Sequence, residues 1–267
     1  MTITRRRFVS LGATALGAAA LAAASAASCG GGPTDDTGAS SRPGGDGRLR
    51  ARPGAPTGTP SPGALGALAP LDLASGRDGL LYVPKRYAPD RPASLVLMLH
   101  GAGGSARGGI NPFLPLADEL GLILLAPDSR GQTWDVILGA YGPDVVFIDR
   151  ALTSVFARYA VSPGRLSVEG FSDGASYALS LGLTNGDLFS RAVAFSPCFS
   201  APASRHGTPR IFVSHGMADA VLPIDGCSRR LVPRLRSAGY EVDYREFDGP
   251  HTVPAEMARG AAEWLAG

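Results

Sequence analysis

Gly170-Phe171-Ser172-Asp173-Gly174 is the stretch that decides the fold of this 267-residue chain. Residues 165–169, just before it, alternate apolar and polar side chains as a short strand does, and residues 175–181 read as a helix with an apolar face. Ser172 is therefore expected on a sharp turn from a strand into a helix. The flanking glycines let the backbones pass closely, and the helix N-terminus favours developing negative charge. The alternative interpretation is a glycine-rich connection with an ordinary capping serine.

Short apolar runs bounded by turn residues predict seven strands, at residues 80–83, 95–99, 122–126, 166–169, 192–195, 211–214 and 242–247. Segments of helical length and period separate most of them, at residues 144–159, 175–183, 226–238 and 252–265. This alternation predicts an α/β fold with a mostly parallel sheet and helices on both faces. Functional residues of such folds gather at the carboxyl ends of the strands. Four loops with chemically useful side chains begin at those ends.

Residues 1–29 are predicted to be an export signal rather than part of the fold. Three arginines, Arg5 to Arg7, precede an Ala/Leu/Gly stretch, as in twin-arginine signals, which export folded proteins. Cleavage after the small residues 24–26 and lipid attachment at Cys29 both stay open, and the second would tether the protein to a membrane. An uncleaved anchor is the alternative to either. The expected location is outside the cytoplasm: extracellular, periplasmic or attached to the cell surface.

Residues 30–69 are rich in Gly, Pro, Ser, Thr and Ala, which predicts a disordered linker, and residues 70–267 are predicted to form one domain. The formal net charge of +2 owes much to arginines in the first 52 residues. The domain is near neutral and has no basic stripe with interleaved aromatic residues, so nucleic acid is not an expected partner.

The cysteines of the domain, Cys198 and Cys227, form an even pair that an oxidising compartment could join. Two buried free thiols are the alternative. Neither cysteine has metal-ligand spacing to another Cys or to a His, so no metal site is expected.

Four motifs together resemble the α/β-hydrolase superfamily. They are the Ser172 pentapeptide and the stretches His100-Gly101-Ala102-Gly103-Gly104, His215-Gly216-Met217-Ala218-Asp219 and Gly249-Pro250-His251-Thr252. The resemblance covers about residues 80–267 and points to the esterase branch with little or no lid, which includes polyhydroxyalkanoate-depolymerase-like, feruloyl-esterase-like and phospholipase/carboxylesterase-like enzymes. It implies the α/β-hydrolase fold, and no organic cofactor.

The residue types and their order predict a nucleophile, a base and an acid. Ser172 needs an adjacent base because a free hydroxyl is a poor nucleophile. His251, in a loop before the last helix, matches the superfamily position of that base, and Asp219 matches that of the acid that orients it. His100, His206 and His215 are the other histidines, and the last of these is expected to be structural. The competing acids are Asp225 and Asp248.

Acyl transfer also needs donors for an oxyanion. The N–H of Asp173, next to the nucleophile, is one, and the resemblance implies Ala102 as the second, with Gly103 as the alternative. Only about a dozen residues separate the strand at 192–195 from the next one, which leaves no room for a cap domain. An open site is expected, with pocket candidates Trp134, Tyr141 and Leu222.

The sequence therefore predicts an exported serine esterase that cleaves a small-molecule or polymeric carboxylic ester through an acyl-enzyme on Ser172. A serine peptidase or amidase of the same fold is one alternative. A tethered binding protein without catalytic activity is another. Oligomeric state and acyl chain length are not determined by these patterns.

Overall fold

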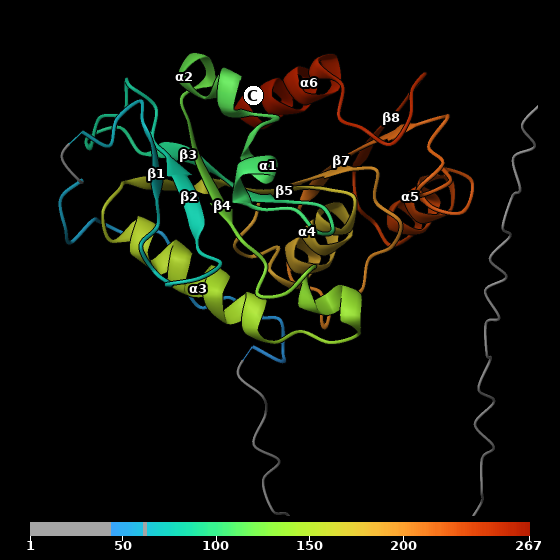
Figure 1. Ribbon diagram of the computed structural model, residues 1–267, viewed down its shortest axis with the longest axis horizontal. Helices are drawn as coiled ribbons and strands as arrows, with labels where there is room; N and C mark the ends of the chain where they lie inside the picture. The colour runs from blue at the N-terminus through green and yellow to red at the C-terminus, as the bar shows by residue number, and fades with distance from the viewer. Residues whose placement is uncertain (1–43, 61–62) are drawn as a thin grey trace, which may run out of the picture. The chain divides into compact units, whose positions relative to one another are not determined.

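An eight-stranded sheet forms the centre of the computed structural model, which describes residues 44–60 and 63–267 (Figure 1). Its spatial order is β1-β2-β4-β3-β5-β6-β7-β8. The pairs β1/β2 and β2/β4 are antiparallel, and all pairs from β4 to β8 are parallel. The strands are β1 (Leu68–Pro70), β2 (Gly79–Tyr82), β3 (Ala93–Leu99), β4 (Leu122–Pro127), β5 (Val161–Phe171), β6 (Arg191–Phe195), β7 (Arg210–Gly216) and β8 (Val242–Phe247). The predicted mostly parallel α/β architecture is confirmed.

Helices cover both faces of the sheet (Figure 1). One face carries α1 (Ala106–Ile110), α2 (Ala117–Leu120) and α6 (Ala255–Ala266). The opposite face carries α3 (Pro143–Phe156), α4 (Asp173–Thr184) and α5 (Ser228–Ser237). Two short 3-10 turns, Leu114–Leu116 and Asp135–Leu138, complete the described helical elements.

Strand β3 shows why the sheet is buried on both faces. Leu95, Leu97 and Leu99 pack into the core under α3 and α4, whereas Val96 and Met98 pack into the core under α1 and α6. All five side chains are at most 1% exposed. A continuous apolar run of this kind is what a central parallel strand requires, because period-2 alternation sends its side chains into two separate cores.

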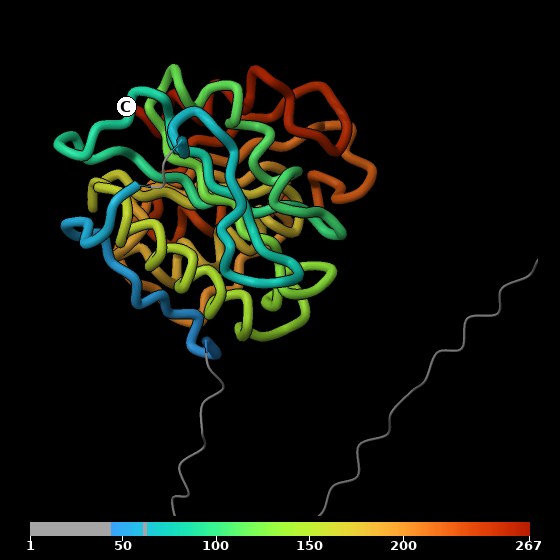
Figure 2. The backbone as a smooth tube through the Cα atoms, turned by 60° about the vertical axis from the view of Figure 1, so that its left-hand side comes forward, coloured from blue at the N-terminus to red at the C-terminus, as the bar shows by residue number. Residues whose placement is uncertain are grey.

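The linker predicted for residues 30–69 is too long. From Gly44 the chain lies along α3 (Figures 1 and 2), and Leu49 is 1% exposed in the core. The side chain of Asp149 on α3 accepts the N–H groups of Arg50 and Ala51, at 2.6 and 2.8 Å. A few apolar residues and these hydrogen bonds order a segment whose composition suggests disorder. The domain therefore begins well before Pro70, while the predicted signal, its Cys29 and residues 30–43 lie outside the described residues.

The connection from β6 to β7, residues 196–209, contains no helix or strand. Superfamily caps are commonly inserted at this point, so the expectation of a domain without a cap is confirmed. Among the helices of residues 44–60 and 63–267, none has both the length and the apolar character needed to span a bilayer.

Candidate active site

Ser172 occupies a strained turn between β5 and α4. Its φ and ψ angles are 58° and −120°, in a region that costs a non-glycine residue about 1–3 kcal/mol. A Cβ on Gly170 would collide with the carbonyl oxygen of Gly174, and a Cβ on Gly174 would collide with that of Leu99. Only glycine fits at either position, because the turn brings these backbones into contact. The turn holds the Ser172 hydroxyl at the carboxyl edge of the sheet.

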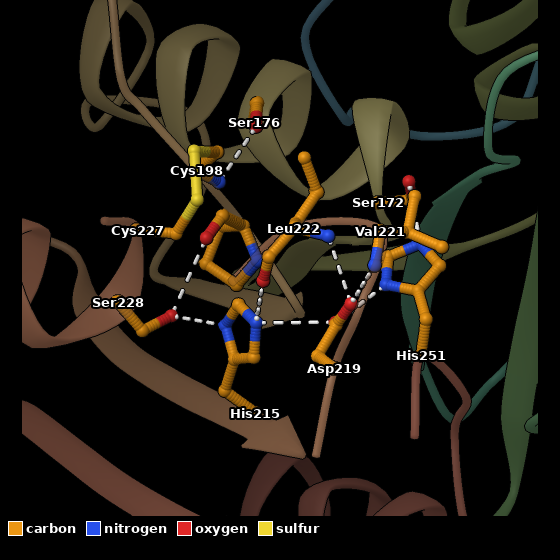
Figure 3. The surroundings of a disulfide bond; sticks show 11 residues. Ser172, Ser176, Cys198, His215, Asp219, Val221, Leu222, Cys227, Ser228 and His251 are labelled. Atoms are coloured by element: carbon orange, nitrogen blue, oxygen red, sulfur yellow. Dashed lines mark hydrogen bonds and ion pairs between the residues drawn. A yellow bond between two sulfur atoms is a disulfide. The ribbon is translucent and has the colours of Figure 1, made fainter. Parts of the chain in front are cut away.

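The structure brings Ser172, His251 and Asp219 together in one chain of hydrogen bonds (Figure 3). His251 Nε2 lies 2.9 Å from Ser172 Oγ, and His251 Nδ1 lies 2.6 Å from Asp219 Oδ2. Because a carboxylate only accepts, Nδ1 donates, and Nε2 of the neutral ring is free to accept the Ser172 proton. Among the described residues, the other two acids considered form no hydrogen bond or ion pair with the His251 imidazole, and Asp225 pairs with Arg229 instead.

The side chain of Asp219 is 0% exposed, and both of its carboxylate oxygens accept hydrogen bonds. Its Oδ1 accepts the N–H groups of Val221 and Leu222, at 2.9 and 2.8 Å. Burial raises the pKa of Asp219, but the donors from Leu222, His251 and Val221 outweigh this and lower the pKa below its ordinary value. The carboxylate is therefore charged and fixed, which suits an acid that orients an imidazole.

His215 is a second histidine beside Asp219, a contact that was not predicted from the sequence. Its Nε2 lies 2.8 Å from the carbonyl oxygen of Leu222 and 3.2 Å from Asp219 Oδ2. Both are acceptors, so Nε2 carries the hydrogen, and Nδ1 accepts from the Ser228 hydroxyl at 2.7 Å. Burial lowers the pKa of His215, which keeps the ring neutral. The i, i+4 spacing of His215 and Asp219 was the one available signal for this contact.

Two backbone N–H groups beside Ser172 are free to meet an oxyanion. Neither the N–H of Asp173 nor that of Ala102 has an acceptor among residues 44–60 and 63–267, whereas the N–H of Gly103 donates to the carbonyl oxygen of Gln132 at 2.7 Å. Gly101 lies against Ser172, since a Cβ on Gly101 would be 3.4 Å from the Ser172 Cβ. Of the two residues considered for the second donor, Ala102 has the available hydrogen.

The loop that carries Ala102 is fixed from beneath by His100 and Arg77. The N–H of Ser129 donates to His100 Nε2 at 3.0 Å, so Nδ1 carries the hydrogen and donates to the carbonyl oxygen of Gly101 at 2.7 Å. Burial lowers the pKa of His100 and favours this neutral form. Arg77 donates to the carbonyl oxygens of Gly104, at 2.9 Å, and Ser129. Arg77 was not predicted to be part of the site, because it lies in a loop before β2 with no motif around it.

The three predicted pocket residues do not line the cavity at the site. Trp134 is 0% exposed, stacks on Tyr177 with ring centroids 5.1 Å apart, and donates to the carbonyl oxygen of His100 at 2.8 Å. Tyr141 is 6% exposed and donates to the carbonyl oxygen of Ala201. Leu222 uses its backbone to hold Asp219 and His215. Large apolar side chains near a site belong more often to the core than to a pocket, and Trp134 and Tyr141 follow that rule, whereas Leu222 is half-buried outside the core.

A cavity of about 560 Å³ lies instead between the Ala102 loop, α1 and the start of α6. Phe171 stands on its wall and packs on the His251 ring with centroids 4.6 Å apart. His100 is the only ionisable residue in its lining, and the other walls are glycine, proline and small apolar residues, with Asn111 as the polar exception. Such a cavity suits an uncharged, apolar group.

Cys198 and Cys227 form a disulfide in the structure (Figure 3). It joins the loop after β6 to the residue before α5, so the pairing considered in the sequence analysis is present. In the described part of the chain, no group of three or more His, Cys, Asp or Glu side chains is arranged to hold a metal ion.

Comparison with known proteins gives sequence relatives and structural neighbours among esterases, although no protein-family model matches the chain. Feruloyl esterase C of Emericella nidulans is 27% identical over 160 residues, which are 57% of this chain and 58% of that protein. A poly(3-hydroxybutyrate) depolymerase of Ralstonia pickettii is 28% identical over 134 residues, 42% of this chain and 27% of that protein. The matched region thus spans less than two thirds of these relatives.

Solved structures share the fold. Esterase PE8 superposes with a TM-score of 0.57 at 23% identity, covering 70% of this chain and 96% of that one. A truncated carbohydrate esterase from gut microbiota gives a TM-score of 0.60 at 17% identity, and the superposition covers 78% of this chain and 98% of that one. The sheet order, the strained serine turn and these superpositions define the α/β-hydrolase fold.

The chain has the α/β-hydrolase fold, and the sequence relatives and structural neighbours that it resembles include esterases.

Proposed function

We propose that this protein is an exported serine esterase that hydrolyses a carboxylic ester through an acyl-enzyme. The observation that carries the proposal is the continuous hydrogen-bonded chain from Ser172 Oγ through His251 to Asp219, at 2.9 and 2.6 Å. The esterase relatives support it. The Cys198–Cys227 disulfide supports export, because such bonds persist in oxidising compartments.

In this mechanism Ser172 Oγ attacks the ester carbonyl carbon while its proton passes to His251 Nε2. Asp219 stabilises the imidazolium that forms, and the oxyanion accepts the N–H groups of Ala102 and Asp173. Collapse of the tetrahedral intermediate breaks the bond to the alcohol, which takes the proton from His251. Water then repeats the sequence on the acyl-enzyme and frees the carboxylic acid. The 560 Å³ cavity beside Ala102 receives an uncharged apolar acyl group.

Replacement of Ser172 by alanine tests the assignment. The Ser172→Ala protein should fold with an unchanged melting temperature, lose hydrolysis of p-nitrophenyl acetate by about 10⁴-fold or more, and escape labelling by an organophosphonate. Ser204→Ala, at an exposed serine that does not line the cavity, is the matched control and should still be labelled. Unchanged turnover in the Ser172→Ala protein would reject the nucleophile. Matched ester and amide substrates in the same assay separate an esterase from a peptidase or amidase, and cleavage of the amide alone would reject the esterase.

A further inference from the structure

A cleft lined by three arginines lies beside the disulfide. Its volume is about 280 Å³, and Arg205, Arg230 and Arg234 line it together with Phe199 and the two bonded cysteines. Arg230 and Arg234 lie one turn apart on α5, and Arg205 comes from the loop between β6 and β7. None of the acidic residues in the part of the chain that the structure describes lines the cleft. The cleft therefore concentrates positive charge from two separate segments of the chain.

The charges in this cleft have no protein partner. Within residues 44–60 and 63–267, Arg205, Arg230 and Arg234 form no ion pair, while the neighbouring Arg229 pairs with both Asp225 and Glu246. Like charges four residues apart also destabilise a helix, so Arg230 and Arg234 weaken α5 while the cleft is empty. A bound anion would relieve this repulsion and form charge-assisted hydrogen bonds with the guanidinium groups.

Two hydrogen bonds connect one wall of the cleft to Ser172 through the first turn of α4. The N–H of Cys198, on its wall, donates to Ser176 Oγ at 3.1 Å, and the N–H of Ser176 donates to the carbonyl oxygen of Ser172 at 3.1 Å. Ser176 and Ser172 are thus about one helical turn, roughly 5.4 Å, apart along α4. Figure 3 shows the disulfide beside Ser176 and Ser172 at the start of the same helix. A chain-like substrate whose ester is at Ser172 can place a neighbouring unit in the cleft.

We propose that this cleft is an anion-binding subsite for the carboxylate groups of an acidic polysaccharide that carries the scissile ester. The proposal rests on the proposed esterase function. Arginine binds carboxylate through two parallel hydrogen bonds. Phe199 is 36% exposed, and its ring offers an apolar face to a sugar ring. A nucleic acid is not favoured, because the three arginines are confined to one small cleft and do not continue as a basic stripe.

Binding of oligogalacturonate to the full chain tests the proposal without turnover. Three proteins, each with Ser172→Ala, are compared by isothermal titration calorimetry: one with no other change, one with Arg230→Gln and Arg234→Gln, and one with Arg150→Gln as the matched control. Arg150 is exposed on α3, with no ion pair among the described residues. The first protein and the control should bind equally, and the double variant about tenfold or more weakly. The affinity should also fall as salt is added.

Any of three results with polymers overturns the proposal: equal affinity of the double variant, equal affinity for neutral dextran, or tighter binding of single-stranded DNA than of oligogalacturonate. Free acetate at the same carboxylate concentration separates a polymer site from a site for any small anion, and equal binding of acetate also overturns the proposal. If the double variant does not melt like its parent, Arg205→Gln, in a loop, repeats the test. Unchanged turnover in the Ser172→Ala protein, with oligogalacturonate binding intact, would reject the proposed function and leave the cleft. Loss of turnover in that protein, with no binding of oligogalacturonate, would reject the cleft alone.

Discussion

Replacement of His215 by alanine should lower the free energy of unfolding by more than it raises the activation free energy of catalysis. His215 is fully buried and contacts three groups: the carbonyl oxygen of Leu222, Asp219 Oδ2 and the hydroxyl of Ser228. The effects on stability and on kcat should differ, because the three groups keep different hydrogen-bond partners when the imidazole is removed.

Leu222 loses the only donor that its carbonyl oxygen has among the described residues, and a buried polar group left without a partner costs about 1–3 kcal/mol. Ser228 can turn its hydrogen to the carbonyl oxygen of Pro197, which is 3.3 Å away. The space left by the ring adds about 1 kcal/mol or more. The free energy of unfolding should therefore fall by about 2–4 kcal/mol. Asp219 keeps His251 and the N–H groups of Val221 and Leu222, so kcat should fall by only about tenfold, or about 1.4 kcal/mol.

Urea unfolding gives the first quantity, and hydrolysis of p-nitrophenyl acetate well below the unfolding transition gives the second. His206→Ala is the matched control, because His206 is exposed and contacts only Ser204 through its ring among the described residues. A loss of kcat near 10⁴-fold, as expected for Asp219→Ala, would refute this reasoning by showing that His215 is indispensable to the acid. An unchanged free energy of unfolding in the His215→Ala protein would also refute this reasoning.

Two other changes test the buried chemistry. Glu169 is 1% exposed, and burial raises its pKa well above 4.5. The folded state therefore keeps a proton that the unfolded state releases. As a result, the free energy of unfolding falls as the pH rises from about 4.5 towards the raised pKa. Urea unfolding of the Glu169→Gln protein should not show this pH-dependent loss of stability, and the variant should be about 1 kcal/mol or more stable than its parent at pH 8. The exposed control Glu256→Gln should behave like the parent. The same pH-dependent loss in the Glu169→Gln protein would count against a buried protonated carboxyl. Replacing Cys198 and Cys227 by serine opens a loop of 29 residues and should lower the free energy of unfolding by roughly 3–4 kcal/mol, and a stability equal to that of the oxidised parent would contradict this.

The sequence predicted the fold well because its strongest signals are local. The apolar runs of the parallel strands, the glycines around Ser172 and the histidine loop before α6 each report a short-range requirement, and the structure places all of them as expected. The pocket could not be predicted in this way. Whether Trp134 faces a cavity or the core depends on Tyr177 and the carbonyl oxygen of His100, which are distant in sequence.

The segment from Gly44 to Pro60 shows a second limit. Its composition favours disorder, but the burial of Leu49, backbone hydrogen bonds to Asp149 and Asn185, and the ion pairs of Arg48 and Arg52 with Asp187 override that tendency. His215 and Arg77 were missed for a related reason, since their importance comes from partners in other loops. Periodicity and motif spacing report what a residue does in its own element, and they carry little information on contacts between elements.

The contacts between loops form a closed path around the site. From Asp219 the path runs through His215 to Ser228, across the adjacent Cys227–Cys198 disulfide to Ser176, and back to Ser172 through α4 (Figure 3). The acid loop, the start of α5 and the nucleophile helix are therefore fixed relative to one another by one covalent link and several short hydrogen bonds. Because the same α5 carries the arginines of the proposed subsite, any change that shifts this helix should alter the acid and the cleft together. Rigid attachment of this kind is what a site needs in order to hold a polymer and its ester in a constant relation.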